Sequence, residues 1–402
     1  MSNNTPPLTG YVRSDGRKGI RNYVVVAYLV ECAHHVAREI AESFKGQPVH
    51  LIGFGGCYPN AYADRMMNRL CTHPNVGAAL LLSLGCESFN RHKLEENIAA
   101  SHRPVHTIVI QQTGGTRKSI AAGVEWVRQA LREIEGVPRA RLTLEELVVG
   151  TVCGGSDATS GVSANPAVGR AFDLLVAQGA AAIFEETGEM IGLGGIMAAR
   201  AVTPELGQEL RQSVDKAAYY YRQMGHASFA PGNAEGGLTT IEEKSIGAYC
   251  KSGDAPITGL IKPGDLPRKG GLYLLDVVPD GEPRFGFPNI NDNAEIAELI
   301  ACGSHLILFT TGRGSVVGSA ISPVIKICAN PQTYERMRDD MDVNAGKILR
   351  LEASVDDVGR EIYRKVLEVA SGDHSCSESL GHQEFVLTYK SFEPIGPHCL
   401  PV

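Results

Sequence analysis

Residues 23–30 read Tyr-Val-Val-Val-Ala-Tyr-Leu-Val, an unbroken apolar run. Such a run is typical of a strand that is buried on both faces of a parallel sheet. Residues 31–44 follow with the periodicity of a helix, because Val36, Ile40 and Phe44 fall on one stripe. Residues 49–54 then form a second apolar run. This succession predicts the strand–helix–strand unit of an α/β protein.

The same rhythm continues into the C-terminal half. Further strands are predicted at residues 78–84, 105–110, 147–152, 180–184, 272–277 and 306–311. A helix should begin at Asn165-Pro166, since asparagine is a good N-cap and proline is tolerated in the first turn. Residues 132–146 are charged and contain Pro138, which indicates a linker or an edge helix. We therefore predict an α/β fold of two lobes, residues 1–146 and 147–402, each a mostly parallel sheet flanked by helices.

The composition and the missing motifs argue against several classes of protein. The formal net charge of the 402 residues is −7, which disfavours non-specific binding to nucleic acid. No apolar run reaches the roughly eighteen residues of a membrane span, and the polar N-terminus does not resemble a signal peptide, so a cytoplasmic location is expected. The fingerprints of dinucleotide-binding proteins, P-loop NTPases and serine hydrolases are absent.

Three of the ten cysteines stand beside glycines at the ends of predicted strands: Cys57, Cys86 and Cys153. Ligands bind beyond the carboxyl ends of strands in open parallel sheets. Thiolate is a good ligand for iron, and three ligands leave a coordination position for substrate. The alternative is that each cysteine is a small buried hydrophobe, as most free cysteines are. The strand-end positions predict that these three cysteines bind a metal.

Several strand ends carry residues that could bind an anion. Ser156, Asp157 and Ser160 lie in a turn rich in glycine and hydroxyl groups, and the backbone N–H groups of such a turn, with the dipole of the next helix, can hold a carboxylate or a sulfonate. Thr116 follows two glycines at another strand end. Arg313 lies between glycines and is free to make a two-pronged contact. We predict these residues as substrate contacts; ordinary turn and capping roles are the alternative.

Acidic and basic side chains in the second half are candidates for proton transfer. Glu185, Glu186 and Glu189 are crowded after a strand, which suits metal ligation or acid–base work, or simply a solvated helix start. Glu242 and Lys244 follow a glycine-rich segment that is predicted to be a mobile loop and a helix start. Their alternative is a charged surface turn. We predict Glu186, Lys244 and Glu242 as catalytic residues.

Taken together, the motifs resemble those of the altronate/galactarate dehydratase family. They are Asp15-Gly-Arg-Lys-Gly-Ile-Arg21-Asn, His73-Pro-Asn-Val-Gly-Ala with Leu84-Gly-Cys-Glu, Cys153-Gly-Gly-Ser-Asp with Ala164-Asn-Pro, Pro231-Gly-Asn with Gly236-Gly-Leu-Thr-Thr-Ile-Glu-Glu-Lys-Ser-Ile-Gly, and Thr311-Gly-Arg-Gly-Ser. The resemblance implies two α/β lobes and a lyase that removes water from a sugar acid with ferrous iron. An iron–sulfur cluster and another divalent metal are the alternatives. Arg21 is a substrate contact or part of a basic β-turn.

Two departures from the family pattern bear on the substrate. Members for altronate and galactarate carry a small β-rich domain ahead of this region, so a separate small subunit is expected to supply it. The turn around Cys57 contains Tyr58 and Pro59, which suggests a reshaped pocket. Both departures fit a branch of the family that eliminates sulfite, not water, from a three-carbon 2-hydroxy acid. A sugar-acid dehydratase, and a non-catalytic subunit that binds a small acid, are the alternatives.

The expected reaction converts a small anionic 2-hydroxy acid into a 2-oxo acid. The metal would act as a Lewis acid toward the substrate, and Glu186 or Lys244 would take the proton from carbon 2. Arg313 and the turn of residues 156–160 would hold the anionic ends. We also expect the large chain to form a homo-oligomer, and we expect no nucleic-acid or membrane partner.

Overall fold

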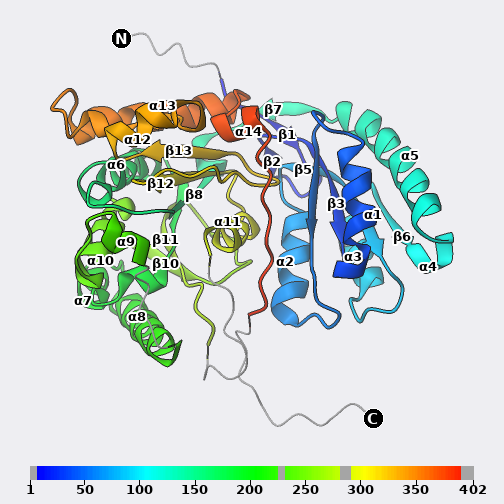
Figure 1. Cartoon of the computed structure of the whole chain (residues 1–402), viewed down its shortest axis with the longest axis horizontal. Helices are drawn as coiled ribbons and strands as arrows, with labels where there is room; N and C mark the ends of the chain where they lie inside the picture. The colour runs from blue at the N-terminus through cyan, green and yellow to red at the C-terminus, as the bar shows by residue number, and fades with distance from the viewer. Residues whose placement is uncertain (1–6, 225–230, 281–290, 391–402) are drawn as a thin grey trace.

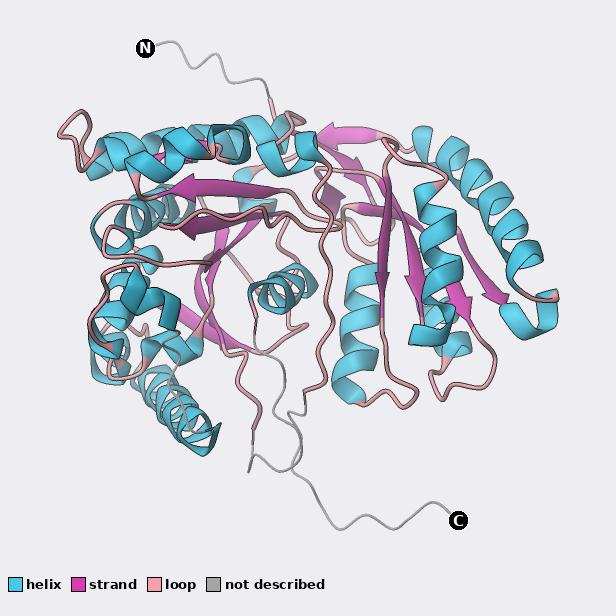
Figure 2. Cartoon of the chain, in the orientation of Figure 1, coloured by secondary structure: helices cyan, strands magenta, loops and turns pink. Residues whose placement is uncertain are grey.

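The computed structural model describes residues 7–224, 231–280 and 291–390, and it consists of two lobes built on parallel sheets (Figures 1 and 2). The first sheet has four parallel strands in the order β4-β3-β5-β6. These strands are β3 (Tyr23–Tyr28), β4 (Val49–Gly53), β5 (Val76–Ser83) and β6 (Val105–Val109). The predicted α/β fold with mostly parallel sheets is confirmed.

Helices cover both faces of the first sheet. Val24 and Val26 of β3 pack in one hydrophobic cluster with residues of α1 (Glu31–Glu42) and α5 (Thr116–Glu135). Val25 and Ala27 point to the opposite face, where α2 (Ala61–Cys71) and α3 (Arg91–Ala100) lie. This alternation follows from the two-residue period of a strand, and it explains why the whole strand is apolar. A short helix, α4 (Ile110–Thr113), precedes α5.

A small antiparallel sheet was not foreseen. It pairs β1 (Thr9–Val12) with β2 (Lys18–Gly19) and with β7 (Arg139–Arg141). The segment 132–146, predicted as a linker or an edge helix, therefore divides into the end of α5, strand β7 and a 3-10 turn, η1 (Leu144–Glu146). A three-residue strand is too short to show a period in the sequence. The boundary after residue 146 stays a prediction.

The second sheet has seven parallel strands in the order β10-β11-β9-β8-β12-β13-β14. Helices α6 (Ala164–Ala177) and α13 (Val355–Ser371) pack against each other on one face, and α11 (Asp292–Ala301) covers the other. The N-cap of α6 is Ser163, so the predicted start at Asn165 is two residues late. The strands are β8 (Val148–Cys153), β9 (Ala181–Phe184), β10 (Ile257–Ile261), β11 (Gly271–Leu275), β12 (Leu306–Thr311), β13 (Val324–Cys328) and β14 (Val343–Asn344).

The remaining helices of the described residues surround the second sheet. The region predicted as a glycine-rich loop contains a short helix before the predicted helix start. The α-helices are α7 (Gly194–Ala199), α8 (Pro204–Met224), α9 (Pro231–Glu235), α10 (Ile241–Tyr249), α12 (Pro331–Arg336) and α14 (Cys376–Leu380). The 3-10 turns are η2 (Ser160–Val162), η3 (Thr187–Met190), η4 (Cys250–Ser252), η5 (Arg338–Asp340) and η6 (Ala345–Lys347).

The two lobes share part of one hydrophobic core. A single cluster joins Val25 and Leu81 of the first sheet to Ile300 and Phe309 of the second lobe, and α11 contacts α2. The fully buried side chain of Asn75 donates across the junction to the carbonyl of His305 at 3.1 Å. The C-terminal segment after α14 runs between the lobes (Figure 1).

A buried ion pair fixes this C-terminal segment. Lys390 Nζ lies 2.8 Å from Glu298 Oε1 of α11, and neither side chain is exposed to solvent. The hydroxyl of Tyr62 from α2 donates to the same carboxylate at 2.6 Å. Lys390 is thereby held against helices of both lobes.

Replacing Lys390 with methionine should lower the free energy of unfolding by about 3 kcal/mol, because it leaves Glu298 as a buried carboxylate without its cation. Chemical denaturation of the purified chain measures this. The matched control is Lys347→Met, which breaks the half-exposed pair with Glu361 and should cost less than about 1 kcal/mol. Equal losses in the two variants would mean that burial of the Lys390 pair contributes nothing.

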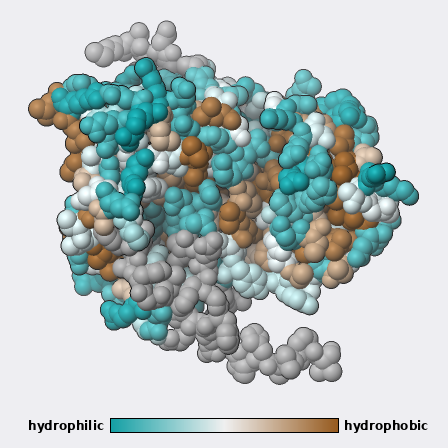
Figure 3. Space-filling view, in the orientation of Figure 1, coloured by the Kyte–Doolittle hydropathy of each residue, from teal (hydrophilic) through white to brown (hydrophobic). Residues whose placement is uncertain are grey.

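The surface in Figure 3 is mostly hydrophilic, with hydrophobic residues in smaller groups. Among the described residues, no helix is both long enough and apolar enough to cross a membrane.

Candidate active site

The candidate site lies at the carboxyl end of β8, near the centre of the second sheet. From β8 the chain moves to β9, β10 and β11 on one side, and it then returns to β12 on the other side of β8. The connection by α6 covers one face of the sheet and the connection by α11 covers the other. Such a reversal of strand order leaves a crevice beyond the strand ends where ligands bind.

A cysteine and two glutamates meet in this crevice. Cys153 is the last residue of β8, Glu186 follows β9, and Glu189 lies in η3. Cys153 Sγ lies 3.2 Å from Glu186 Oε1 and 3.3 Å from Glu189 Oε2. One ligand atom from each residue can be chosen so that all three lie within 4.8 Å of one another, and all three residues are buried.

Two lysines neutralise these carboxylates. Lys251 from η4 forms an ion pair with Glu186, and Lys244 from α10 forms one with Glu189. The side chain of Lys251 is only 1% exposed, so its charge is compensated inside the protein. We refer to Cys153, Glu186, Glu189, Lys244 and Lys251 as the thiol–carboxylate cluster.

The members of the cluster perturb one another's ionisation. Burial, Glu186 and Glu189 together raise the pKa of the Cys153 thiol well above its ordinary value. Burial and the charge of Glu189 raise the pKa of Glu186 to about 7, despite Lys251. Burial would raise the pKa of Glu189 as well, but Lys244 and Lys251 outweigh it and hold that pKa below its usual value. Groups with pKa values moved apart in this way are typical of reactive sites.

The backbone at Glu186 is strained. Its φ angle is +79°, in the left-handed region that residues other than glycine rarely adopt. A conformation of this kind costs on the order of 1–3 kcal/mol and persists where the surrounding structure enforces it, most often at functional sites. It turns Glu186 toward Cys153 at the strand end.

A cavity of about 380 Å³ opens beside the cluster, within the range of about 300–1,000 Å³ that is usual for small-molecule sites. Its wall includes Ser156, Ser160 and Lys244, and Lys244 is the one member of the cluster that lines it. Gly161 and Gly247 let α10 approach the turn after β8: a Cβ on Gly161 would lie 2.9 Å from the Cα of Gly247. This close packing places Lys244 at the cavity.

A sequence comparison identifies the family of this chain. The profile described as D-galactarate/Altronate dehydratase, C-terminal, matches residues 144–392, which is more than half of the chain. The chain belongs to the D-galactarate/altronate dehydratase family. A second profile, D-galactarate dehydratase/Altronate hydrolase, second domain, matches residues 10–135. The resemblance seen in the motifs is thereby confirmed.

Relatives of known activity are lyases, and so is this chain. The (2R)-sulfolactate sulfo-lyase subunit beta of Chromohalobacter salexigens is 33% identical, over 94% of this chain and 96% of the relative. The altronate dehydratase of Bacillus subtilis is 30% identical, over 92% and 75% of the two chains. The galactarate dehydratase (L-threo-forming) of Escherichia coli is 30% identical, over 91% and 74%.

Two of the three cysteines predicted as metal ligands in this lyase do not reach the cluster. Cys57 and Cys86 follow β4 and β5 at the carboxyl edge of the first sheet, and both are exposed. Thr116, at the start of α5, belongs to the same edge. The strands of the two sheets run in different directions (Figure 2), so their carboxyl edges do not converge. No group of described residues that could hold a metal joins Cys153 to Cys57 or Cys86.

Arg21 and Glu242 also lie outside the cavity beside the thiol–carboxylate cluster. Arg21 precedes β3, at the amino end of its sheet, and its guanidinium donates to Glu378 at 2.7 Å and to the carbonyl of Val369 at 3.0 Å. It holds the end of α13 and α14 against the first lobe. Glu242 is exposed in the first turn of α10 and does not line the cavity.

Asp157 and Arg313 both lie near the site, but they make different contacts. The Asp157 carboxylate accepts from Thr159 N at 2.9 Å and from Asn330 Nδ2 at 3.1 Å, so it fixes the turn that carries Ser156 and Ser160. Arg313 is 41% exposed and contacts Glu235 of α9 at 3.2 Å. The turn is therefore built by Asp157, and Arg313 stands at its outer side.

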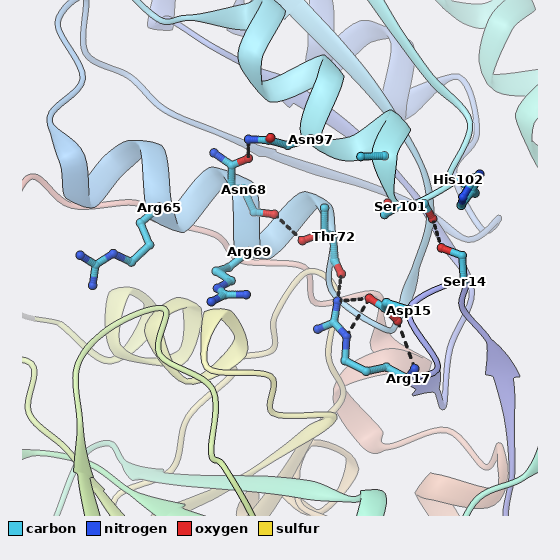
Figure 4. Close-up of a pocket in the computed structure, with 11 residues that line it drawn as sticks. Ser14, Asp15, Arg17, Arg65, Asn68, Arg69, Thr72, Asn97, Ser101 and His102 are labelled. Carbon is cyan, nitrogen blue, oxygen red and sulfur yellow. Dashed lines mark hydrogen bonds and ion pairs between the residues drawn. The ribbon is translucent and has the colours of Figure 1, made fainter.

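The motif of residues 15–22 forms a hairpin turn at a different pocket (Figure 4). Arg17 donates to Asp15 at 2.9 Å and to the carbonyl of Thr72 at 2.8 Å. Arg69 donates to the carbonyl of Gly264, which belongs to the other lobe. Arg17 and Arg69 are engaged in structural contacts, and those of Arg17 fit the alternative of a basic turn for residues 15–22.

Some members of the site were not foreseen. Lys251 lies in Cys250-Lys-Ser-Gly253, a stretch without a motif that would have indicated a role. Glu295, which lies close to Glu186, belongs to α11, a helix whose residues 294–301 are all buried. Glu189 was noted only as one of three crowded glutamates. Their roles depend on contacts between segments that are far apart in the chain.

Proposed function

We propose that this lyase eliminates sulfite from sulfolactate in the cavity beside the thiol–carboxylate cluster. One observation carries the proposal. Lys244 pairs with Glu189 of this cluster, and it also lines a cavity whose wall includes Ser156 and Ser160. The relative named as a sulfo-lyase subunit matches along almost the whole of both chains, which supports sulfolactate as the substrate. Elimination of sulfite from sulfolactate leaves the enol of pyruvate, which becomes the 2-oxo acid.

The residues of the cavity can bind a doubly anionic substrate. Ser156 and Ser160 offer hydroxyl groups, and the start of α6, where Asn165 lines the wall, adds the positive end of a helix dipole. Arg313 at the outer side can meet the second anionic group. Lys244 would accept the proton from carbon 2 in its neutral form. Burial lowers the pKa of Lys244, but the charge of Glu189 outweighs burial and keeps that pKa above its ordinary value in the metal-free chain, so a bound cation would be needed to lower it.

The thiol–carboxylate cluster fits a divalent metal. A thiolate with two carboxylates is a mixed donor set suited to ferrous iron, and in the metal-free chain Lys244 and Lys251 supply the positive charges that these carboxylates require. Cys153, Glu186 and Glu189 would be the ligands. The chemistry that ferrous iron supplies there is Lewis acidity toward the substrate hydroxyl and a positive charge that lowers the pKa of a neighbouring lysine. Glu186 is then a ligand, and Lys244 is the base.

Metal binding should depend on pH, because protons compete for the ligands. Glu186, with a pKa of about 7, and Cys153, with a raised pKa, must both lose a proton. Affinity of the metal-depleted chain for ferrous iron should therefore rise with pH through neutrality, by up to about tenfold per pH unit for each proton released. Calorimetry in buffers of different ionisation enthalpy counts these protons. Iron binding to the Glu186→Gln variant should release one proton fewer than binding to the wild type. An unchanged proton count would mean that Glu186 is not a metal ligand.

The proposed enzyme includes a second, separate subunit. The matching sulfo-lyase chain is named as a subunit beta, so that enzyme has another subunit. We propose that the present lyase acts together with a small β-rich subunit and that the large chain also self-associates. Size determination of the co-expressed chains by light scattering tests both statements.

The decisive assay compares two substrates. The chain is produced anaerobically with its small subunit, loaded with ferrous iron, and given sulfolactate and altronate in parallel. Sulfite and pyruvate from sulfolactate alone are the expected result. A keto-deoxy acid from altronate would instead make the chain a sugar-acid dehydratase, the second candidate, which the 28–30% identity with altronate dehydratases supports.

A further inference from the structure

A second group of carboxylates lies next to the thiol–carboxylate cluster. Glu185 follows β9 directly, and Glu295 lies in the first turn of α11. One carboxylate oxygen from each of Glu185, Glu186 and Glu295 can be chosen so that all three lie within 4.8 Å of one another. Glu186 thus belongs to both groups. Glu185 is completely buried, and the other two are 6% exposed.

Glu185 has no partner for its charge among the residues that the structure describes. Both of its carboxylate oxygens are buried without a hydrogen bond among the described residues. The lysines of the thiol–carboxylate cluster form ion pairs with Glu186 and Glu189, and no ion pair in the described part of the chain reaches Glu185 or Glu295. Burying an ionised carboxylate without a partner is costly, so either a proton or a bound cation must neutralise Glu185.

Neighbouring residues of α11 add further carboxyl groups to this region. Glu298, one turn after Glu295, is paired with Lys390, which is therefore committed elsewhere. Asp292, one turn before Glu295, adds another carboxylate, whose Oδ2 would lie 3.1 Å from a Cβ on Gly154. Among the described residues, the ammonium groups of Lys244, Lys251 and Lys390 are thus outnumbered by six nearby carboxyl groups: Glu185, Glu186, Glu189, Asp292, Glu295 and Glu298.

We propose that Glu185, Glu186 and Glu295 form a second divalent-cation site, which adjoins the Cys153 site through Glu186. An all-carboxylate donor set selects a hard cation such as Mg²⁺ or Mn²⁺, whereas the thiolate of Cys153 favours a softer one. The inference goes beyond the proposed function, because it stands on the unpaired oxygens of Glu185 and holds for any substrate.

The competing explanation is that Glu185 and Glu295 share a proton. Two carboxyl groups that share a site can avoid like-charge repulsion by keeping one of them protonated. A proton-sharing pair needs no cation and has no affinity for Mn²⁺. The two explanations therefore differ in a direct binding measurement.

Mn²⁺ binding to the metal-depleted full chain, followed by the loss of the free-ion electron paramagnetic resonance signal, tests the proposal. The variants Glu185→Gln and Glu295→Gln keep shape and remove one charge each. Both should weaken Mn²⁺ binding at least tenfold, while Cys153→Ser should bind Mn²⁺ as the wild type does. Mn²⁺ should also raise the Tm of the wild type and of Cys153→Ser, but not that of the two glutamine variants.

Co²⁺ distinguishes the two sites, because its thiolate absorption band reports on Cys153 alone. The glutamine variants should keep this band, and Cys153→Ser should lose it. A wild type that fails to bind Mn²⁺, or glutamine variants that bind it unchanged, would overturn the second site. If the wild type shows no lyase activity or no Co²⁺ band, while its Mn²⁺ binding still depends on Glu185, the proposed function is overturned and the second site stands.

Discussion

Replacing Lys244 with methionine should lower kcat/KM by about 10³-fold, within the range of roughly 10²–10⁴ that general acid–base catalysis contributes. Lys244 joins the cluster to the cavity: it pairs with Glu189 and lines the wall beside Ser156. Without its amine, the proton on carbon 2 loses its proposed acceptor. Steady-state measurement of sulfite release checks the prediction.

A second variant separates proton transfer from charge. Lys244→Arg keeps a positive charge next to Glu189 but cannot give up a proton at ordinary pH. We expect it to keep a KM close to that of the wild type and to lose kcat almost as far as the methionine variant does. Lys347→Met, at a distant surface pair, is the control for a lost lysine. An arginine variant with near wild-type kcat would assign Lys244 an electrostatic role and leave the base elsewhere.

Replacing Cys153 with serine should abolish iron retention and, with it, activity. Changes in groups that only support a metal ligand already lower affinity about 10–100-fold, so loss of the thiolate itself should cost at least about 100-fold. Iron quantification after anaerobic gel filtration measures retention. Serine is close in size to cysteine, and its hydroxyl can donate to the Glu186 carboxylate that the thiol contacts, so the fold should accept it.

Cys57→Ser and Cys86→Ser are the matched controls, because both cysteines are exposed at the edge of the other sheet. Each should retain iron as the wild type does. If either loses iron as completely as Cys153→Ser, then the two lobes close during the reaction and the three-cysteine ligand set predicted from the sequence is correct.

The sequence predicted eight strands of the two parallel sheets, and it missed β10, β13 and the shortest elements. The buried strands Tyr23–Tyr28 and Leu306–Thr311 have apolar runs long enough to be recognised in the sequence. For the second strand, the predicted and observed bounds are the same. Strand β7 and the two-residue strands β2 and β14 have no such signal. They exist because tertiary contacts supply partners for their backbone groups.

For the site, the sequence indicated Cys153 and Glu186 by their place at strand ends, and Lys244 by the glycine-rich segment before a predicted helix start. The tertiary structure decided which strand ends meet. Cys57 and Cys86 share the glycine-flanked pattern of Cys153, but they belong to a sheet whose strands point elsewhere (Figure 2). Lys251 and Glu295 have no local signal at all, since their importance comes from lying opposite Glu186 and Glu185.

The family, the α/β class and the lyase chemistry were therefore fixed by local sequence, because strand periodicity and glycine-rich turns depend on neighbouring residues. The composition of the charge cluster was fixed only by the fold. Whether a buried carboxylate is paired depends on side chains brought to it from η4, α10 and α11, and no spacing along the chain encodes that encounter.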